Sequence, residues 1–208
     1  MSTSESPTGT STISSSRLET FSDGVFAIAA TLLILDVRAG GPGELGTQLR
    51  HSWPSYVAYA VSFLTIGIIW INHHTVFTQI RRVDRLFLLI NVAFLMLVAF
   101  IPFPTSLIAS HLRGSDLEPA ALAYGATLTI TAALFNLLWF YASLGHRLLR
   151  ADADPRVVSG ISRSYVPGPF IYLGATLIAL VSPIASVVGF GIITVFYIVE
   201  SSLFGRSG

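Results

Sequence analysis

The sequence of 208 residues contains no cysteine and no lysine, and only 11% of its residues are charged, against about 25% in ordinary globular chains. The lack of cysteine excludes disulfides, thiolate catalysis and cysteine-based metal sites. The lack of lysine excludes Schiff-base chemistry and a phosphate-binding lysine. Because the net charge is only +1, nothing in the composition attracts nucleic acid.

Apolar residues make up 52% of the chain, and the mean hydropathy is +0.70. A soluble fold would have to hide this apolar surface behind too few charges, whereas a membrane-spanning helix needs about 20 mostly apolar residues. We therefore predict an all-α integral membrane protein with six spans. They lie at about 18–37, 53–72, 86–108, 119–144, 166–181 and 184–204, with a loop over 145–164. The last two could instead form a re-entrant hairpin, and Pro102 and Pro104 are expected to kink or end the third.

Charge predicts how the chain is oriented in the membrane. Residues 1–16 are rich in serine and threonine and lack the regions of a signal peptide, so we interpret them as a disordered cytoplasmic tail that precedes a membrane domain over 17–208. With six spans, nine arginines lie on the side of the termini and three on the other side. The positive-inside rule then places both termini in the cytoplasm.

Polar residues inside a span are costly and usually functional. The first span carries Asp23 near its cytoplasmic end, and a buried carboxylate needs partners. Side chains at the end of the second span and the start of the third lie at the same depth, so we expect a polar cluster that ties the first three spans together. The residues of this expected network are Arg17, Phe21, Ser22, Asp23, Trp70, His73, His74 and Asn91.

The first span also carries an apolar stripe at helical spacing, formed by Ile28, Leu32 and Leu35. At 100° per residue, Ser22 lies about 120° from Ile28, and Asp23 lies about 140° away in the other sense. The polar residues and the stripe therefore face different neighbours. A stripe of this kind most often packs against another helix or lipid, so the spacing alone does not indicate a pore.

The run RLETFSD over residues 17–23 resembles the R-x-x-x-F-S-D motif of the transmembrane protein 175 family, the endosomal and lysosomal type potassium channels and their prokaryotic relatives. Residues 24–29 and 31–33 are similar to the first helix of that family, as are Trp70 and the His73/His74 pair. The motif occurs once. The resemblance implies a prokaryotic-type homotetramer of six-span subunits in the plasma membrane, with the first helix of each subunit lining a central pore. It also implies that no carbonyl-lined filter is present, and the sequence contains no TVGYG segment.

The resemblance further implies roles for individual residues of the first helix. Ile28 matches the hydrophobic constriction, Leu32 and Leu35 extend it outward, and Thr31 matches a hydroxyl position associated with cation selectivity. Thr31 could instead bond back to a carbonyl of its own helix. Asp36 is either part of an outer ring that concentrates cations or an ordinary residue at the membrane interface. The motif residues match an inter-helix network rather than the pore surface.

The function implied is a potassium-permeable cation channel that closes by dewetting of apolar rings. Potassium is then only the permeant ion; no cofactor, resident metal or soluble substrate is expected, and the partners are other copies of the chain and the bilayer. The alternative is a proton-coupled secondary transporter that uses Asp23 and His73 or His74. An enzyme is not expected, because no nucleophile, base and metal are assembled.

Overall fold

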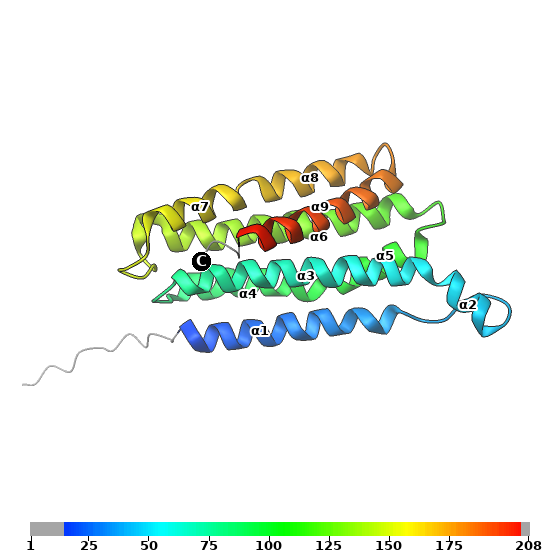
Figure 1. The fold of residues 1–208 in the computed structure, drawn as a ribbon, viewed down its shortest axis with the longest axis horizontal. Coiled ribbons are helices and arrows are strands. Elements are labelled where there is room, and N and C mark those ends of the chain that lie inside the picture. Colours follow the sequence, from blue (N-terminus) through cyan, green and yellow to red (C-terminus); the bar gives the residue numbers. More distant parts are fainter. Residues whose placement is uncertain (1–14, 205–208) are drawn as a thin grey trace, which may run out of the picture.

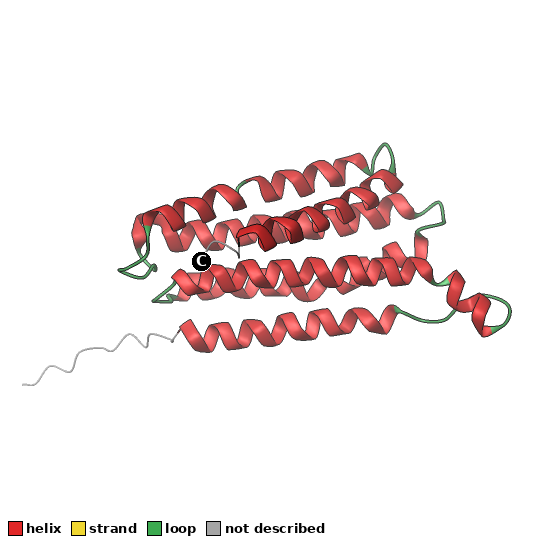
Figure 2. Cartoon of the chain, in the orientation of Figure 1, coloured by secondary structure: helices red, strands yellow, loops and turns green. Residues whose placement is uncertain are grey.

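The computed structural model describes residues 15–204, and these form a bundle of helices that lie side by side (Figure 1). Loops join the helices (Figure 2). The first helix, α1, is followed by a short 3₁₀ turn, η1, and two long elements are each made of two helices that meet at a kink. The elements are α1 (Ser15–Leu32), η1 (Leu33–Asp36), α2 (Leu45–His51), α3 (Trp53–Gln79), α4 (Arg85–Phe100), α5 (Pro102–His111), α6 (Leu117–Ser143), η2 (Leu144–His146), α7 (Pro155–Tyr165), α8 (Pro167–Ile178) and α9 (Pro183–Phe204).

Four helical segments are long and apolar enough to cross a membrane, and these are Ser15–Asp36, Trp53–Gln79, Arg85–His111 and Leu117–His146. They correspond to the first four predicted spans, so an all-helical chain with several membrane-capable helices is confirmed. α9 is apolar over the shorter range Pro183–Val199. The number of six crossings stays a prediction. Of the predicted tail over 1–16, only residues 15 and 16 lie within the described part, where they begin α1.

Two boundaries differ from the sequence prediction because proline kinks these helices without ending them. Ile101 keeps helical angles of φ −51° and ψ −40° before Pro102, so α5 continues α4 as far as His111. Val166 does the same before Pro167, and it joins α7 to α8. A proline removes one helical hydrogen bond and kinks the helix there. Of the two expectations for Pro102 and Pro104, an early end of the third span is wrong, because the helical segment runs from Arg85 to His111.

The loop predicted over 145–164 is wrong in its second half, because α7 already begins at Pro155. Asp154 caps α7 by accepting a hydrogen bond from the backbone N–H of Arg156 at 2.8 Å. The helix is amphipathic: Val158, Ile161 and Tyr165 pack against the core, and Ser162 on the same side accepts a hydrogen bond from Trp139 at 2.9 Å. This helix was not predicted from the sequence because its hydropathy is low. Long apolar runs indicate membrane spans, whereas a short amphipathic helix contains no such run.

α6 lies at the centre of the bundle, in contact with α4, α5, α8 and α9. α8 approaches it closely at Gly125, where a Cβ atom would overlap the side chain of Thr176 and come within 2.7 Å of Phe190. Only glycine therefore allows this spacing. The hairpin of α8 and α9 consequently packs along α6 (Figure 1).

The loops at the predicted cytoplasmic end are tied to one another by backbone hydrogen bonds. Arg81 N–H donates to the carbonyl of Leu148 at 2.9 Å, and Arg150 N–H donates to the carbonyl of Gln79 at 2.9 Å. These bonds connect the end of α3 to the segment after α6. They hold together the same end of the bundle at which the polar residues of α1 lie.

Asp84 strengthens this junction. Its carboxylate accepts the N–H of Phe87 at 2.8 Å, which caps α4, and the hydroxyl of Tyr141 at 2.7 Å. Arg147 lies 3.5 Å from the same carboxylate. Burial by itself raises the pKa of Asp84, but the hydrogen bonds from Phe87 and Tyr141 and the charge of Arg147 outweigh it and hold the pKa below its usual range.

We expect Asp84→Asn to lower the melting temperature of the purified protein at pH 7 and to have no effect at acidic pH. A carboxylate with a depressed pKa in the folded state stabilises the fold above its unfolded pKa, and this contribution is lost as pH falls through the folded pKa. The difference should be modest, below about 1 kcal/mol, because the ion pair is partly exposed. Asp116→Asn is the control, since that side chain caps no backbone group of α6. A difference that is the same at all pH values would contradict the assignment.

Candidate functional site

α1 has one face that packs on the bundle and one that does not. The packed face touches α3 and α4, and its buried residues, including that of η1, are Leu18, Ser22, Phe26, Ala29 and Leu33. The other face carries the predicted stripe. The side chains of Ile28, Leu32 and Leu35 are 61%, 41% and 60% exposed. An apolar face left open on a membrane helix at the edge of the bundle (Figure 1) meets either lipid or another protein surface, as do exposed apolar residues on the other helices.

The turn η1 changes the alignment of this stripe. A 3₁₀ helix has three residues per turn, so residues three apart eclipse one another. Leu35 therefore lies in line with Leu32 instead of drifting around the helix as it would in α geometry. Asp36, also exposed, ends the turn. Within residues 15–204, no hydrogen bond or ion pair holds its carboxylate.

Thr31 lies exposed beside the stripe, and its hydroxyl bonds back into its own helix. The Oγ1–H donates to the carbonyls of Ala27 and Ile28, both at 2.9 Å. The proton is thereby used on the backbone, while the lone pairs of Oγ1 remain for a further partner. On this side Thr31 can act as an acceptor, which is the property that a cation requires.

A buried chain of hydrogen bonds fixes the opposite face of α1. Ser22, Asn91 and His73 are all fully buried. The Asn91 amide donates to Ser22 Oγ at 3.1 Å, and its Oδ1 lies 3.0 Å from His73 Nε2. Because an amide oxygen only accepts, His73 carries its proton on Nε2 and donates it. One residue from each of α1, α4 and α3 is thus joined in a row.

Aromatic rings hold His73 in place. The ring is stacked on Phe77 at 4.3 Å and lies parallel to Phe94 at 5.7 Å, and Phe26 of α1 meets it edge-on at 5.3 Å. Its Nδ1 has no hydrogen-bond partner among the described residues. The imidazole therefore packs like a fourth aromatic residue that makes one directed hydrogen bond.

A second, more exposed set of contacts joins α1 to α3. Trp70 Nε1–H donates to Asp23 Oδ1 at 2.9 Å, and His74 Nδ1 lies 3.0 Å from Glu19 Oε1. The Trp70 and His74 rings stack at 6.2 Å. From Glu19 to Asp23 the chain of α1 advances four residues, and from His74 to Trp70 that of α3 goes back four residues, as expected for antiparallel helices. We call these two contacts the ladder.

Most of the residues predicted for the network lie close together, but they form two sets and not one cluster. Asp23 makes no hydrogen bond to either histidine, since His73 bonds to Asn91 and His74 to Glu19. Arg17 and Phe21 are exposed, and within the described part of the chain Arg17 has no hydrogen-bond or ion-pair partner. Our sequence reasoning missed Glu19. The available signal was the equal spacing of Glu19 and Asp23 on one helix and of Trp70 and His74 on the other.

These features define a helical membrane protein whose first helix is bonded to its neighbours on one face and left open on the other. The family model described as endosomal/lysosomal potassium channel TMEM175 matches residues 17–102. A potassium channel of Streptomyces collinus is 41% identical over 191 residues, which cover 88% of this chain and 91% of the relative. The chain belongs to the TMEM175 family.

A solved structure and an animal relative agree with this assignment. The crystal structure of a lysosomal potassium-selective channel TMEM175 homolog from Chamaesiphon minutus superposes with a TM-score of 0.81 at 35% identity, covering 90% of this chain and 97% of that one. A TMEM175 proton channel of Gallus gallus is 35% identical over 147 residues. The match covers 65% of this chain and only 29% of that animal protein.

We expect Asn91→Leu to lower the free energy of unfolding by about 1–2 kcal/mol, because it leaves the buried Nε2–H of His73 without an acceptor and removes the hydrogen bond that joins α4 to Ser22. Asn72→Leu is the control: it removes the same amide group from a half-buried position on α3, next to His73, and its side chain makes no hydrogen bond within the described residues. Thermal unfolding of the purified protein in detergent measures both. Equal melting temperatures for the two variants would show that the buried chain does not stabilise the fold.

Proposed function

We propose that four copies of this chain form a potassium-permeable cation channel in the plasma membrane. Each subunit has six spans with both termini in the cytoplasm, and α1 of each subunit lines a central pore. The observation that carries this proposal is the open apolar face of α1, exposed over Ile28, Leu32 and Leu35. With a fourfold axis along this face, those side chains from the four copies surround the central pore. The potassium channels among the relatives support the choice of ion.

The gate in this proposal is a ring of four Ile28 side chains, with Leu32 and Leu35 forming further rings outward. A narrow apolar constriction expels water, and an ion that cannot shed its hydration shell does not pass. A small widening lets water and partly hydrated cations enter. Conduction is then controlled by pore diameter rather than by a charged plug.

In this proposal, the selectivity for potassium over sodium comes from a small number of oxygen ligands in the pore. The carbonyls along α1 are engaged in helical hydrogen bonds, so a ring of free carbonyls like that of an ordinary potassium filter does not form there. Thr31 supplies a ring of hydroxyl oxygens whose lone pairs face the open side. Potassium loses its shell more easily than sodium, and a ring of this kind favours it modestly. A ring of Asp36 carboxylates at the outer mouth concentrates cations of either type.

The buried chain and the ladder have a positioning role in the channel. Because successive residues of a helix are 100° apart, a modest rotation of α1 would turn Ile28 away from the axis. Ser22 and Asn91 fix that rotation through a buried hydrogen bond. Asp23 and Trp70 add a second fixed point on α1. These residues act through α1 and do not touch the ion.

We expect Ile28→Asn to raise potassium flux several-fold, because a ring of amides stays wet where a ring of isoleucines dries. The measurement is potassium and sodium efflux from liposomes that hold the purified protein. Ile130→Asn is the matched control, since Ile130 is also about half exposed but lies on α6. Unchanged flux in Ile28→Asn would remove Ile28 from the gate.

The same liposomes separate the channel from the transporter. With a proton ionophore and a pH dye present, a channel passes potassium without a proton gradient. Flux that requires the gradient would favour the proton-coupled transporter that uses Asp23 and His73 or His74. Native mass spectrometry of the protein measures the number of copies, because a channel of this design needs a symmetry axis and a transporter does not.

A further inference from the structure

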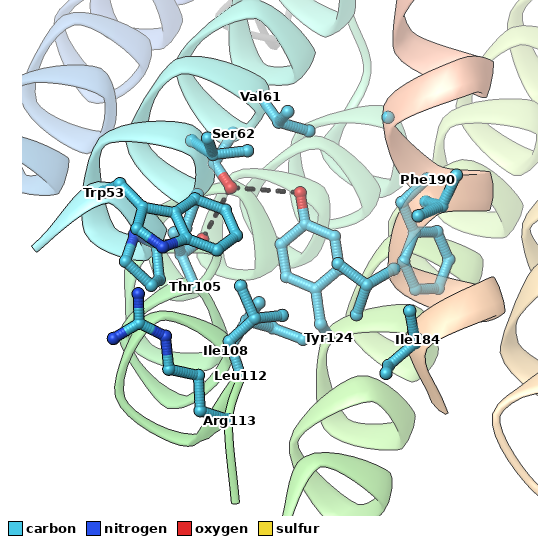
Figure 3. Close-up of a pocket in the computed structure, with 16 residues that line it drawn as sticks. Trp53, Val61, Ser62, Thr105, Ile108, Leu112, Arg113, Tyr124, Ile184 and Phe190 are labelled. Atoms are coloured by element: carbon cyan, nitrogen blue, oxygen red, sulfur yellow. Dashed lines mark hydrogen bonds between the residues drawn. The ribbon is translucent and has the colours of Figure 1, made fainter. Parts of the chain in front are cut away.

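A cavity of about 390 Å³ lies between α3, α5, α6 and α9, at the end of the bundle opposite the polar network (Figure 3). It is within the size range of small-ligand sites, about 300–1,000 Å³. No residue of α1 lines it, so the proposed pore does not use it. Its walls are almost wholly apolar, with Val57 and Val61 on α3, Ile108 on α5 and Ile184 and Val188 on α9.

One end of the cavity carries a positive charge. The Arg113 guanidinium lies 5.5 Å from the centre of the Trp53 ring, and its Nη1 is 3.1 Å from His51 Nδ1. In the part of the chain that the structure describes, no carboxylate pairs with Arg113. Tryptophan and arginine at the ends of membrane helices typically lie at the level of lipid headgroups.

The other end of the cavity is closed by side chains that satisfy one another. Ser62 Oγ lies 3.0 Å from Tyr124 Oη, and Thr105 Oγ1–H donates to Ser62 Oγ at 2.8 Å (Figure 3). No free polar group is therefore left to hold a polar ligand deep in the cavity. Trp53 and Ser62 are nine residues apart on α3, which corresponds to about 13 Å along the helix.

A cation at the mouth and apolar walls about 13 Å long match an amphiphile with a negative head and a hydrocarbon chain. We propose that this cavity binds one acyl chain of an anionic phospholipid, with the phosphate group at Arg113. The bilayer supplies this molecule directly, because Ile184 and Val188 on the α9 side are more than half exposed. The site goes beyond the proposed channel and does not depend on it.

Native mass spectrometry of the full protein with added phosphatidylglycerol or phosphatidylcholine, of identical chains, tests the headgroup. We expect the wild type to retain one phosphatidylglycerol per chain in preference to phosphatidylcholine. Arg113→Gln should reduce that preference about fivefold, the effect of one arginine near an anionic headgroup. Arg50→Gln, an exposed arginine on α2 that does not line the cavity, should leave it unchanged. An unchanged preference in Arg113→Gln, or equal losses in both variants, would overturn the proposal.

A second pair of variants tests whether the chain enters the cavity. Gly191 lines it, and a Cβ atom there would meet nothing within 4 Å, so Gly191→Phe places a ring in open space. Gly174 on α8 is equally open but lies elsewhere, and Gly174→Phe is the control. We expect Gly191→Phe, and not Gly174→Phe, to lose the retention of phosphatidylglycerol and of any phosphatidylcholine. Both variants should keep the wild-type melting temperature and number of copies.

Two results of this second pair would overturn the proposal. One is full lipid retention in Gly191→Phe, which would place the lipid outside the cavity. The other is a combination of two observations: the wild type retains no lipid, and Gly191→Phe changes the number of copies in the assembly. That combination would show that another copy of the chain covers this face. If Gly191→Phe does not fold, the comparison of Arg113→Gln with Arg50→Gln decides.

Discussion

The rotation of α1 about its own axis is the constraint on which the rest of the proposed site depends. A buried polar side chain in a membrane protein must find its partner inside the protein. The Asn91 amide does so by donating to Ser22 Oγ and by accepting from His73. That requirement presses one face of α1 against α3 and α4. The residues left on the other face are then determined by helical geometry alone, and they are apolar. In the proposed channel, a network that does not contact the ion would therefore decide which side chains line the pore.

The sequence predicted the parts of this arrangement that follow from helical periodicity. The long apolar runs gave the membrane-capable helices, and spacing separated the Ile28 stripe from Ser22. Periodicity could not predict which polar groups pair across helices, because that depends on the relative height of two antiparallel segments. Glu19 was missed for this reason, and Asp23 was grouped with histidines to which it makes no hydrogen bond. α7 was missed because its apolar residues, such as Val158 and Ile161, are too few to form a run.

The two ends of the bundle are built in different ways. At the end with the motif, the buried chain, the ladder, the Asp84 junction and the backbone bonds between loops all connect neighbouring helices. At the opposite end Ser62, Tyr124 and Thr105 bond to one another across three helices, and beside them lies a cavity instead of packed side chains. Regions with fewer packed contacts open more readily. The motif end is therefore the rigid part of the subunit, and the cavity end is the deformable part.

The ladder has a mechanical consequence for α1. Its two contacts are spaced by one helical turn, about 5.4 Å, so a slide of α1 by one turn along α3 would keep at most one of them. In one direction Asp23 would reach the height of His74, and Trp70 would face Ala27, which has no acceptor on its side chain. The hydrogen bond from Asn91 to Ser22 would break as well. The two contacts therefore hold α1 at a single height along α3. In the proposed channel, widening the pore without breaking these contacts would require the outer half of α1 to lean away from the axis, with the motif as the pivot.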